Sequence, residues 1–361
     1  MGSNQTLDEL RARIDAVDDQ LLKLISERAG LAVAVGAAKA RESGDTTFYR
    51  PEREAQKLRR IQADNPGPLA DAEVARLIRE IMSSCLALEQ PLTIAYLGPP
   101  GTFTHAAAAK QFGGAVTLTP TASIDEVFRK VETGQANYGV VPVENSTEGV
   151  VPQTLDRLRE STLSVCGETM LAVHHLLLSK APDIGAVERV LAHPQAIAQC
   201  RRWLDRELPG VERVAVSSNG EGARHAAEDP NAAAIASSTA AELYGLEALA
   251  ENIEDSAHNT TRFLVLAGRA PGPSGNDKTS LMFTMRNEPG ALYGALQVFA
   301  DAGVSMSRIE SRPSDSARWE YYFYIDIEGH GDDPVVAEAL ACLEERVALL
   351  RVFGSYPCAA H

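Results

Sequence analysis

Residues 6–41 are predicted to form one long helix, which constrains the fold more than any other part of the chain. Thr6 and Glu9 make a capping box at its start. Three helices of which one is this long cannot close a compact core alone, so we expect it to pair with a second copy of the chain. Apolar residues follow a heptad seam along it, at Leu7, Leu10, Ile14, Val17, Leu21, Leu24, Leu31, Val35 and Ala38.

A cation interrupts this apolar seam. Arg28 occupies a seam position, where a guanidinium loses hydration unless an anion meets it. Lys39 follows on nearly the same side of the helix, about 16 Å further along the axis. The two side chains can converge on a small dianion; alternatively, Arg28 snorkels and Lys39 is a surface charge. Arg11 also flanks the seam, but about 25 Å from Arg28, too far to share a small ligand within one chain.

Sequence pattern divides the chain into three segments. Residues 1–91 show only helical periodicity, with further helices expected at 50–63 and 69–89. Residues 92–270 alternate short apolar runs with helical stretches, which indicates an α/β domain that can form two lobes. The expected strands are 93–97, 138–143, 174–178, 189–192, 213–216, 233–236 and 263–267, and the expected helices lie near 103–112, 123–133, 150–160, 194–207, 219–228 and 238–245. After a Pro-Gly linker, residues 276–361 follow the βαββαβ order of a ferredoxin-like α+β domain.

Composition and charge limit the class of protein. At 361 residues the chain exceeds one ordinary core, and it contains no run of 18 apolar residues that would span a membrane. No secretory signal is visible, and five scattered cysteines favour reduced thiols in the cytoplasm and no metal site. A net charge of −15 argues against nucleic-acid binding and requires local cation clusters if the substrates are anions.

The helical segment resembles the all-helical chorismate mutases. The stretches LRARIDAVDDQLLKLISERAGLAVAVGAAKA, RPEREAQ and REIMSSCLALEQ carry the resemblance. It implies an intertwined helical dimer in which Arg11 crosses into the partner's pocket. To rearrange chorismate to prephenate, the protein must hold the dianion in a folded conformation and stabilise the negative charge that grows on the ether oxygen. The reaction needs no cofactor. The implied substrate contacts are Arg11, Arg28, Lys39, Arg53 and Glu54.

Three positions depart from the best-known mutase pattern. Arg50 stands where an Asp is often found and is kept as a candidate contact. Cys85 aligns with a position where Ser is common, and Ser84 beside it is the alternative. Glu89 stands where a Gln often donates to the ether oxygen. An ionised carboxylate cannot donate a hydrogen bond, so we expect Glu89 to be protonated in the active complex.

The second segment resembles the prephenate dehydratase domain, which has a two-lobed fold like that of periplasmic binding proteins. AYLGPPGTFTHAAA, GVVPVENSTEGVV, AHPQAIAQC and NTTRFLVL carry the resemblance. The turn 98–102 opens a helix and suits an anion, with a plain strand–helix connection as the alternative. The resemblance places the essential hydroxyl at Thr261, which either meets the departing oxygen or orients a water. The other implied substrate contacts are Glu144, Asn145, Ser146, Gln199 and Arg262.

Some polar residues near these motifs have simpler explanations. Ser146 can equally serve as a turn or N-cap residue. His174, His175 and His193 are expected to pack or to cap. Cys200 resembles a family position near the site, but no neighbouring His pattern supports a thiolate nucleophile.

The third segment resembles an ACT regulatory domain. Two motifs carry the resemblance, one between the first strand and helix and one at the end of the second strand. In dehydratases of this type they bind phenylalanine at an interface between two such domains, and a helix N-terminus suits its carboxylate. The implied effector contacts are Asn287, Gly290, Ala291, Leu292, Glu310, Ser311, Arg312 and Pro313.

The order of the three resemblances identifies the chain as a member of the bifunctional chorismate mutase–prephenate dehydratase family. This implies an isomerase and a carbon–oxygen lyase that together convert chorismate, through prephenate, to phenylpyruvate in phenylalanine biosynthesis. We expect a homodimer or higher homo-oligomer under feedback by phenylalanine. Two alternatives stay open: a catalytically inactive amino-acid sensor, and a dehydratase whose helical segment only dimerises.

Overall fold

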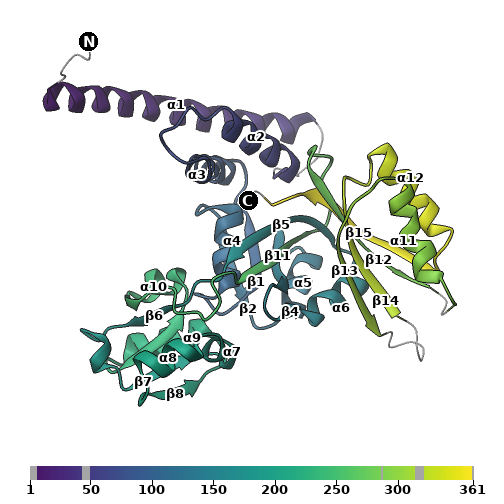
Figure 1. The fold of residues 1–361 in the computed structure, drawn as a ribbon. Helices are drawn as coiled ribbons and strands as arrows, with labels where there is room; N and C mark the ends of the chain where they lie inside the picture. The colour runs from purple at the N-terminus through teal and green to yellow at the C-terminus, as the bar shows by residue number, and fades with distance from the viewer. Residues whose placement is uncertain (1–5, 43–48, 286–287, 314–320, 360–361) are drawn as a thin grey trace, which may run out of the picture. The chain divides into compact units, whose positions relative to one another are not determined.

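The computed structural model describes residues 6–42, 49–285, 288–313 and 321–359 (Figure 1). The chain forms two compact units, which are described separately. The first comprises Met1–Arg50, Arg60–Leu92 and Phe112–Thr117, and the second comprises Pro51–Arg59, Thr93–Gln111 and Leu118–His361.

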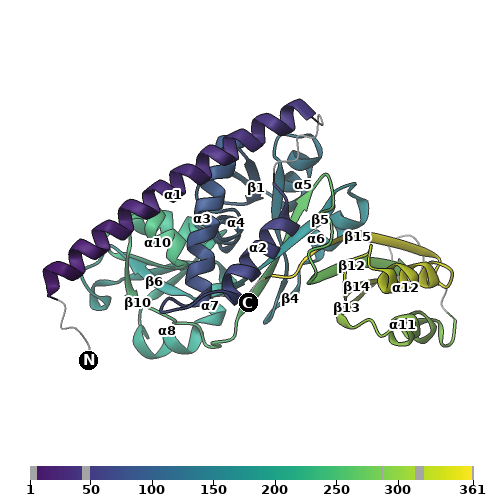
Figure 2. The same cartoon turned by 90° about the horizontal axis from the view of Figure 1, so that it is seen from above.

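Helix α1 (Leu7–Glu42) dominates the first unit, and Figure 2 shows it as one unbroken helix. The capping box is confirmed, because the Thr6 amide donates to Glu9 Oε2 at 2.8 Å and the Glu9 amide donates to Thr6 Oγ1 at 3.3 Å. Helix α3 (Asp71–Glu89) packs along α1. The heptad seam of α1 nevertheless stays exposed, with Ile14 and Leu24 59% and 61% accessible. Within the described ranges, no helix is long and apolar enough to cross a membrane.

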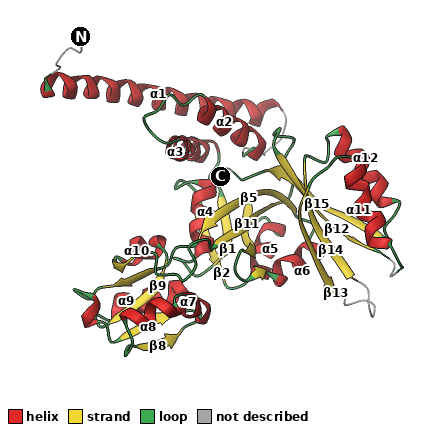
Figure 3. Ribbon diagram, viewed as in Figure 1, coloured by secondary structure: helices red, strands yellow, loops and turns green. Residues whose placement is uncertain are grey.

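The second unit contains three sheets (Figure 3). The first sheet has the order β2-β1-β3-β11-β5, with β4 paired to β3. Strand β1 runs parallel to β3, whereas β11 runs antiparallel to both β3 and β5. Its members are β1 (Thr93–Leu97), β2 (Thr117–Thr121), β3 (Tyr138–Asn145), β4 (Gly149–Val150), β5 (Ser164–Ala172) and β11 (Thr260–Ala267), flanked by α4 (Phe103–Phe112), α5 (Ile124–Glu132) and α6 (Pro152–Glu160).

The second sheet forms a lobe of its own, with the order β10-β6-β9-β7-β8. The chain enters this lobe after β5 and returns through β11, so two segments join the lobes, and the expected two-lobed fold is confirmed. Strand β9 reads Ala-Ala-Ala-Ile-Ala and is fully buried, as expected for a central strand. The members are β6 (Leu176–Ser179), β7 (Arg189–Ala192), β8 (Glu212–Ala215), β9 (Ala232–Ala236) and β10 (Glu247–Ala250), with η1 (Ile184–Ala186), α7 (Pro194–Gln199), α8 (Arg201–Glu207), α9 (Asn219–Glu228) and α10 (Ser238–Tyr244).

The C-terminal domain has the expected βαββαβ order and an antiparallel sheet, β13-β14-β12-β15. One face of the sheet packs against its two helices through residues such as Phe283 and Ile325. The other face, with Met282 and Tyr324, joins the core of the first lobe. The elements are β12 (Asp277–Thr284), α11 (Ala291–Asp301), β13 (Met306–Pro313), β14 (Tyr321–Glu328), α12 (Pro334–Glu344) and β15 (Leu349–Pro357).

The Pro-Gly linker is fixed in place by hydrogen bonds. Arg59 Nη2 donates to the Ser274 carbonyl and to Ser274 Oγ, and the Ser274 amide donates to Asp277 Oδ2. Gln56 Nε2 donates to the Pro273 carbonyl at 3.3 Å. Arg59 and Gln56 belong to α2 (Pro51–Ala63), so this helix holds the connection between the dehydratase-like and C-terminal domains.

Candidate active sites

The first candidate site lies between α1 and α3. Arg28 Nη1 donates to the Ile81 carbonyl at 3.3 Å. Lys39 Nζ lies 3.9 Å from Glu89 Oε2, and both side chains are mostly buried. Ile81, Cys85 and Glu89 are spaced four apart and share one face of α3. The two cations of α1 therefore bracket the stretch of α3 that carries Cys85 and Glu89.

The alternatives at the third helix differ in exposure. Cys85 is 4% exposed, whereas Ser84 is exposed and lies off this shared face. Gly36 allows close contact between the helices, because a Cβ there would meet Glu89 Cβ at 3.4 Å. Of the two candidates, Cys85 is the one turned toward α1.

The structure does not bring Arg11 to this cluster. Arg11 is exposed and lies 3.6 Å from Asp8, many turns of α1 before Arg28. Arg50 precedes α2 as its N-cap residue, and Arg53 and Glu54 follow in the first turn. The substrate contacts predicted for these four residues stay predictions.

The second candidate site centres on Thr261 in β11. Thr261 is paired in register with Asn145 of β3, so their side chains lie on the same face of the sheet. Asn145 Nδ2 donates to Thr261 Oγ1 at 2.8 Å and to Asn259 Oδ1 at 2.7 Å. Because the Thr261 oxygen accepts from Asn145, its own proton is directed to another acceptor. This arrangement gives Thr261 a fixed donor direction.

A row of polar side chains continues from Thr261 into the second lobe. Asn259 Nδ2 donates to Gln199 Oε1 at 3.4 Å, and Gln199 Nε2 donates to Glu148 Oε1 at 3.2 Å. His175 Nε2 lies 2.9 Å from Gln199 Oε1. Burial lowers the pKa of His175, which favours a neutral ring, so Nε2 carries the proton and donates to the amide oxygen. The row therefore links the two lobes by directed hydrogen bonds.

Sequence reasoning missed three members of this row. Asn259 stands two residues before Thr261. Because side chains alternate between the two faces of an extended chain, this spacing places both on the same face and could have identified Asn259 from the sequence. Glu148 follows Asn145 within one turn, where the Glu148 amide donates to Asn145 Oδ1 at 3.1 Å. His175 was expected to pack, and the structure gives it a hydrogen bond to Gln199 as well.

Ser146 makes backbone contacts. Its Oγ donates to the His258 carbonyl at 3.0 Å and accepts from the Thr260 amide at 3.0 Å. These bonds tie the end of β3 to the start of β11. They match the turn role that the sequence left open. The predicted substrate contact of Ser146 stays a prediction.

Two further predicted contacts, Glu144 and Arg262, face away from Thr261. They are paired in register with each other, next to the Asn145–Thr261 pair, and neighbouring residues of a strand point to opposite faces. Arg262 Nε donates to Glu168 Oε2 at 2.7 Å, and Arg308 Nε lies 3.0 Å from Glu144 Oε2. Substrate binding by Glu144 and Arg262 stays a prediction, while the structure shows both in contact with other protein charges.

The glycine turn at 98–102 lies where the two lobes meet. The Gly101 amide donates to His105 Nδ1 at 3.1 Å, and Ser237 Oγ donates to the Gly101 carbonyl at 3.1 Å. A Cβ on Gly220 would lie 2.5 Å from the Pro100 carbonyl oxygen, so only glycine fits there. The turn thus packs tightly on the second lobe.

Cys200 is fully buried at the junction of α7 and α8. Burial raises the pKa of its thiol, which disfavours the thiolate form. This agrees with the sequence argument against a nucleophilic cysteine.

The predicted effector motifs divide between two faces of the C-terminal sheet. Gly290 adopts a left-handed conformation (φ 81°) directly before α11, which begins with Ala291 and Leu292, and Asn287 lies outside the described residues. Along β13, Glu310 and Arg312 are half-buried, while Ser311 and Pro313 are exposed. Arg312 Nη1 donates to Asp156 Oδ1 at 2.9 Å and to the Pro152 carbonyl at 2.8 Å. Arg312 therefore contacts α6 in this structure.

Comparisons with known proteins agree with this arrangement. Family models match three parts of the chain: chorismate mutase type II at residues 10–90, prephenate dehydratase at 94–271 and the ACT domain at 279–344. A bifunctional chorismate mutase/prephenate dehydratase of Pseudomonas aeruginosa is 51% identical over 361 residues, 99% of both chains.

Two solved structures resemble the chain outside its helical segment. The prephenate dehydratase of Arthrobacter aurescens in complex with L-Phe is 37% identical, covers 74% of this chain and 90% of its own, and has a TM-score of 0.68. A protein described as GqqA, a novel type of quorum quenching acylase, is 34% identical, covers 74% of this chain and 98% of its own, and also has a TM-score of 0.68.

Proposed function

Because the chain belongs to the family of bifunctional chorismate mutase/prephenate dehydratases, we propose that it converts chorismate to prephenate and prephenate to phenylpyruvate. The proposed domains are a mutase at 1–91, a dehydratase at 92–270 and a regulatory domain at 276–361. The observation that carries the dehydratase assignment is the hydrogen bond from Asn145 to Thr261 in a polar row that joins two lobes.

The mutase reaction rests on positioning and charge. Arg28 and Lys39 bind the two carboxylates, which brings the reacting carbons together. The ether C–O bond breaks while a C–C bond forms, and negative charge grows on the ether oxygen. Glu89, 3.9 Å from Lys39 in the structure, donates to that oxygen in its protonated form. Cys85 lies between the cations and lines the substrate.

A second copy of the chain completes the mutase site. The exposed heptad seam of α1 supports this, because so long an apolar stripe is unstable in water without a partner. In the paired arrangement Arg11 contributes to the pocket of the partner, which explains how a residue about 25 Å from Arg28 takes part.

The dehydratase reaction removes two groups from prephenate. The bond to the ring carboxylate breaks, its electrons enter the ring as CO2 leaves, and the ring C–O bond breaks at the far side. The departing hydroxide takes a proton and leaves as water. Thr261 donates toward this oxygen, either directly or through a water that it orients, and Asn145 fixes its direction. Gln199 and Asn259 hold the polar substrate between the lobes.

Phenylalanine is the proposed effector of the C-terminal domain. The relative from Arthrobacter aurescens is described in complex with L-Phe, and the ACT model matches residues 279–344 here. The start of α11 at Gly290 suits the carboxylate of an amino acid. Ser311 and Pro313 are exposed on β13, and Ser311 pairs in register with Phe323 on the face of the sheet that packs against α11. Binding should lower dehydratase activity.

The test is formation of phenylpyruvate from prephenate by the full chain. Wild type should be active, and Thr261→Ala should lose about a hundredfold or more in kcat. Thr260→Ala is the matched control, since the Thr260 amide rather than its hydroxyl contacts Ser146. An inactive wild type would favour the amino-acid sensor. Full activity in Thr261→Ala would refute the role of this hydroxyl. If wild type fails to consume chorismate, the helical segment serves only in dimerisation.

A further inference from the structure

Two charged pairs stand directly behind the Thr261–Asn145 pair. Arg262 of β11 and Glu144 of β3 are paired in register on the opposite face of the sheet. In the C-terminal domain, Arg308 of β13 and Asp326 of β14 are likewise paired in register. Each pair thus holds one cation and one anion side by side.

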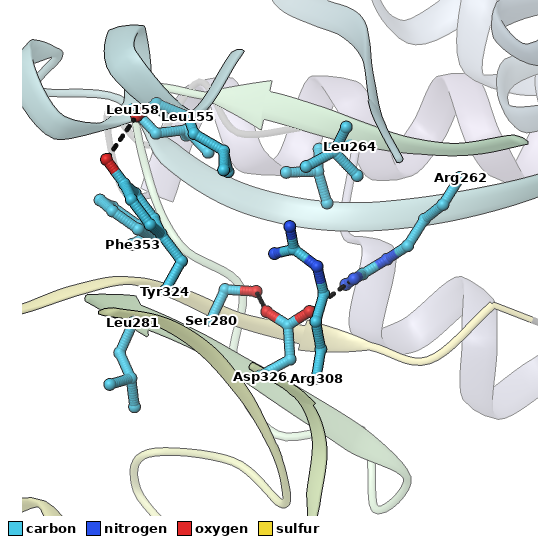
Figure 4. A pocket seen from close by; sticks show the side chains of 11 residues that line it. Leu155, Leu158, Arg262, Leu264, Ser280, Leu281, Arg308, Tyr324, Asp326 and Phe353 are labelled. Atoms are coloured by element: carbon cyan, nitrogen blue, oxygen red, sulfur yellow. Dashed lines mark hydrogen bonds and ion pairs between the residues drawn. The ribbon is translucent and has the colours of Figure 1, made fainter. Parts of the chain in front are cut away.

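The two pairs meet with opposite charges facing. Arg262 Nη1 donates to Asp326 Oδ2 at 2.5 Å, and Arg308 Nε lies 3.0 Å from Glu144 Oε2. Figure 4 shows Arg262, Arg308 and Asp326 gathered at the boundary between the dehydratase and C-terminal domains. We call Glu144, Arg262, Arg308 and Asp326 the ion cluster.

The two halves of the ion cluster differ in how well they are bonded. Asp326 also accepts from Ser280, and Arg262 Nη2 donates to Tyr356 Oη at 2.9 Å. Burial would raise the pKa of Asp326, but the positive charges of Arg262 and Arg308 outweigh it and keep this pKa below its usual range. This half is buried, ionised and well supplied with hydrogen bonds.

The Arg308 half is loosely bonded. Its side chain is 10% exposed, yet among the described residues neither Nε nor Nη2 makes an aligned hydrogen bond, despite the short distance to Glu144. A cavity of ≈ 10 Å³ adjoins it, room for about one water molecule. Arg308 is thus the part of the cluster that can change partners most readily.

We propose that the ion cluster positions Thr261 and Asn145 for the dehydratase reaction and makes their position depend on the C-terminal domain; this rests on the proposed dehydratase function. Glu144 and Arg262 adjoin Asn145 and Thr261 along their strands, so any shift of the cluster moves the backbone of the reacting pair. Arg262 is then a positioning residue, held by Asp326.

The same geometry connects the cluster to the regulatory strand. Arg308 lies on β13, two residues before Glu310 and in the strand that carries the predicted effector motif. A ligand that displaces β13 therefore acts on Glu144 through Arg308, and on Thr261 through the pairing of β3 with β11. This gives the coupling a contiguous physical route.

Two neutral substitutions in the full chain test this proposal, Asp326→Asn and Arg308→Met. Each should lower the dehydratase kcat by about tenfold or more, as expected for a misplaced reacting group, while the KM for prephenate changes less than about twofold. Both should weaken inhibition by phenylalanine. Mutase activity, measured on the same samples, should be unchanged because it belongs to the other compact unit, and the near-wild-type KM for prephenate shows that the substituted unit is folded.

Asp156→Asn is the matched control. It breaks the Arg312–Asp156 ion pair, which crosses the same domain boundary from the same strand but away from Thr261. Its dehydratase kcat should match wild type. An equal loss of kcat in Asp156→Asn would overturn the proposal, because any weakened domain contact would then suffice.

Other outcomes also decide the matter. An unchanged kcat in Asp326→Asn and Arg308→Met, or a raised KM at constant kcat, would overturn the proposal. Asp326→Asn removes one of the two carboxylates that meet the buried Arg262, the other being Glu168, and can fail to fold. In that case Glu144→Gln, Arg308→Met and their double variant carry the test, since Glu144 is the more exposed residue. The double variant should lose no more kcat than either single variant, and additive losses would contradict the coupling. A wild type that forms no phenylpyruvate refutes the proposed function, and this inference with it.

Discussion

A mutase site shared between two copies of the chain makes a specific prediction for Arg11. Arg11 and Arg28 lie on one continuous helix, about 25 Å apart along its axis, so they cannot hold the same small ligand within one chain. Arg11→Ala should remove a contact that is made only across the dimer. We expect a loss of about a hundredfold in mutase kcat/KM, the effect of removing one charge-stabilising donor.

Co-expression of Arg11→Ala with Lys39→Ala locates that contact. With random assembly about half of the dimers are hybrids, and each hybrid has one site with both substitutions and one with neither. About a quarter of all sites are then intact. The mixture should recover about a quarter of wild-type mutase activity, although each variant alone is nearly inactive.

The assay is the initial rate of chorismate loss, with phenylpyruvate formation from prephenate measured on the same preparations. Dehydratase activity should be the same in all of them, because neither substitution lies in that domain. The two variants purified separately and assayed immediately after mixing provide the control without exchange of subunits. Activity of the co-expressed sample equal to the mean of the two variants would refute a shared site.

Three further predictions concern other residues. Glu89→Gln should keep mutase kcat within a few-fold of wild type, because an amide can donate to the ether oxygen; a loss of about a hundredfold would contradict a hydrogen-bond donor at this position. Gly220→Ala should lower dehydratase kcat/KM while Gly210→Ala, which has open space around it, should not, because only the former pushes on the Pro100 carbonyl. Burial lowers the pKa of His175, so protonation favours the unfolded chain; the thermal midpoint should fall as pH drops below about 6.5, and less so in His175→Asn.

The sequence predicted the elements whose own residues specify them. The strands at 93–97 and 189–192 and the helices at 103–112 and 219–228 match the structure to the residue. Their apolar runs and caps are local signals, as is the capping box at the start of α1. The helix expected at 194–207 proves to be two, α7 and α8, which meet at Cys200.

Strands β2, β4, β5 and β10 were not predicted. Strand β2 contains Pro120 at the edge of its sheet, where a missing donor is tolerated. Strand β5 carries Glu168, which interrupts the apolar pattern that would mark a buried strand. The structure buries Glu168 because Arg262 and Lys278 meet its carboxylate. These partners come from distant parts of the chain, so no local pattern could reveal the strand.

The motif around Thr261 shows what a motif can and cannot specify. Thr261 and Arg262 are consecutive in an extended strand, so they face opposite sides of the sheet, and a cleft on one side receives only one of them. The alternation of side chains along the strand therefore separates Thr261, which meets the substrate, from its neighbour Arg262. It also places Asn259 on the same face as Thr261. What lies behind Arg262 depends on how the sheet of the C-terminal domain docks against β11, and Asp326, 64 residues later, and Arg308 could not be named in advance. If their charges position Thr261, then two adjacent residues of one motif serve the reaction from opposite faces, one by contact and one by support.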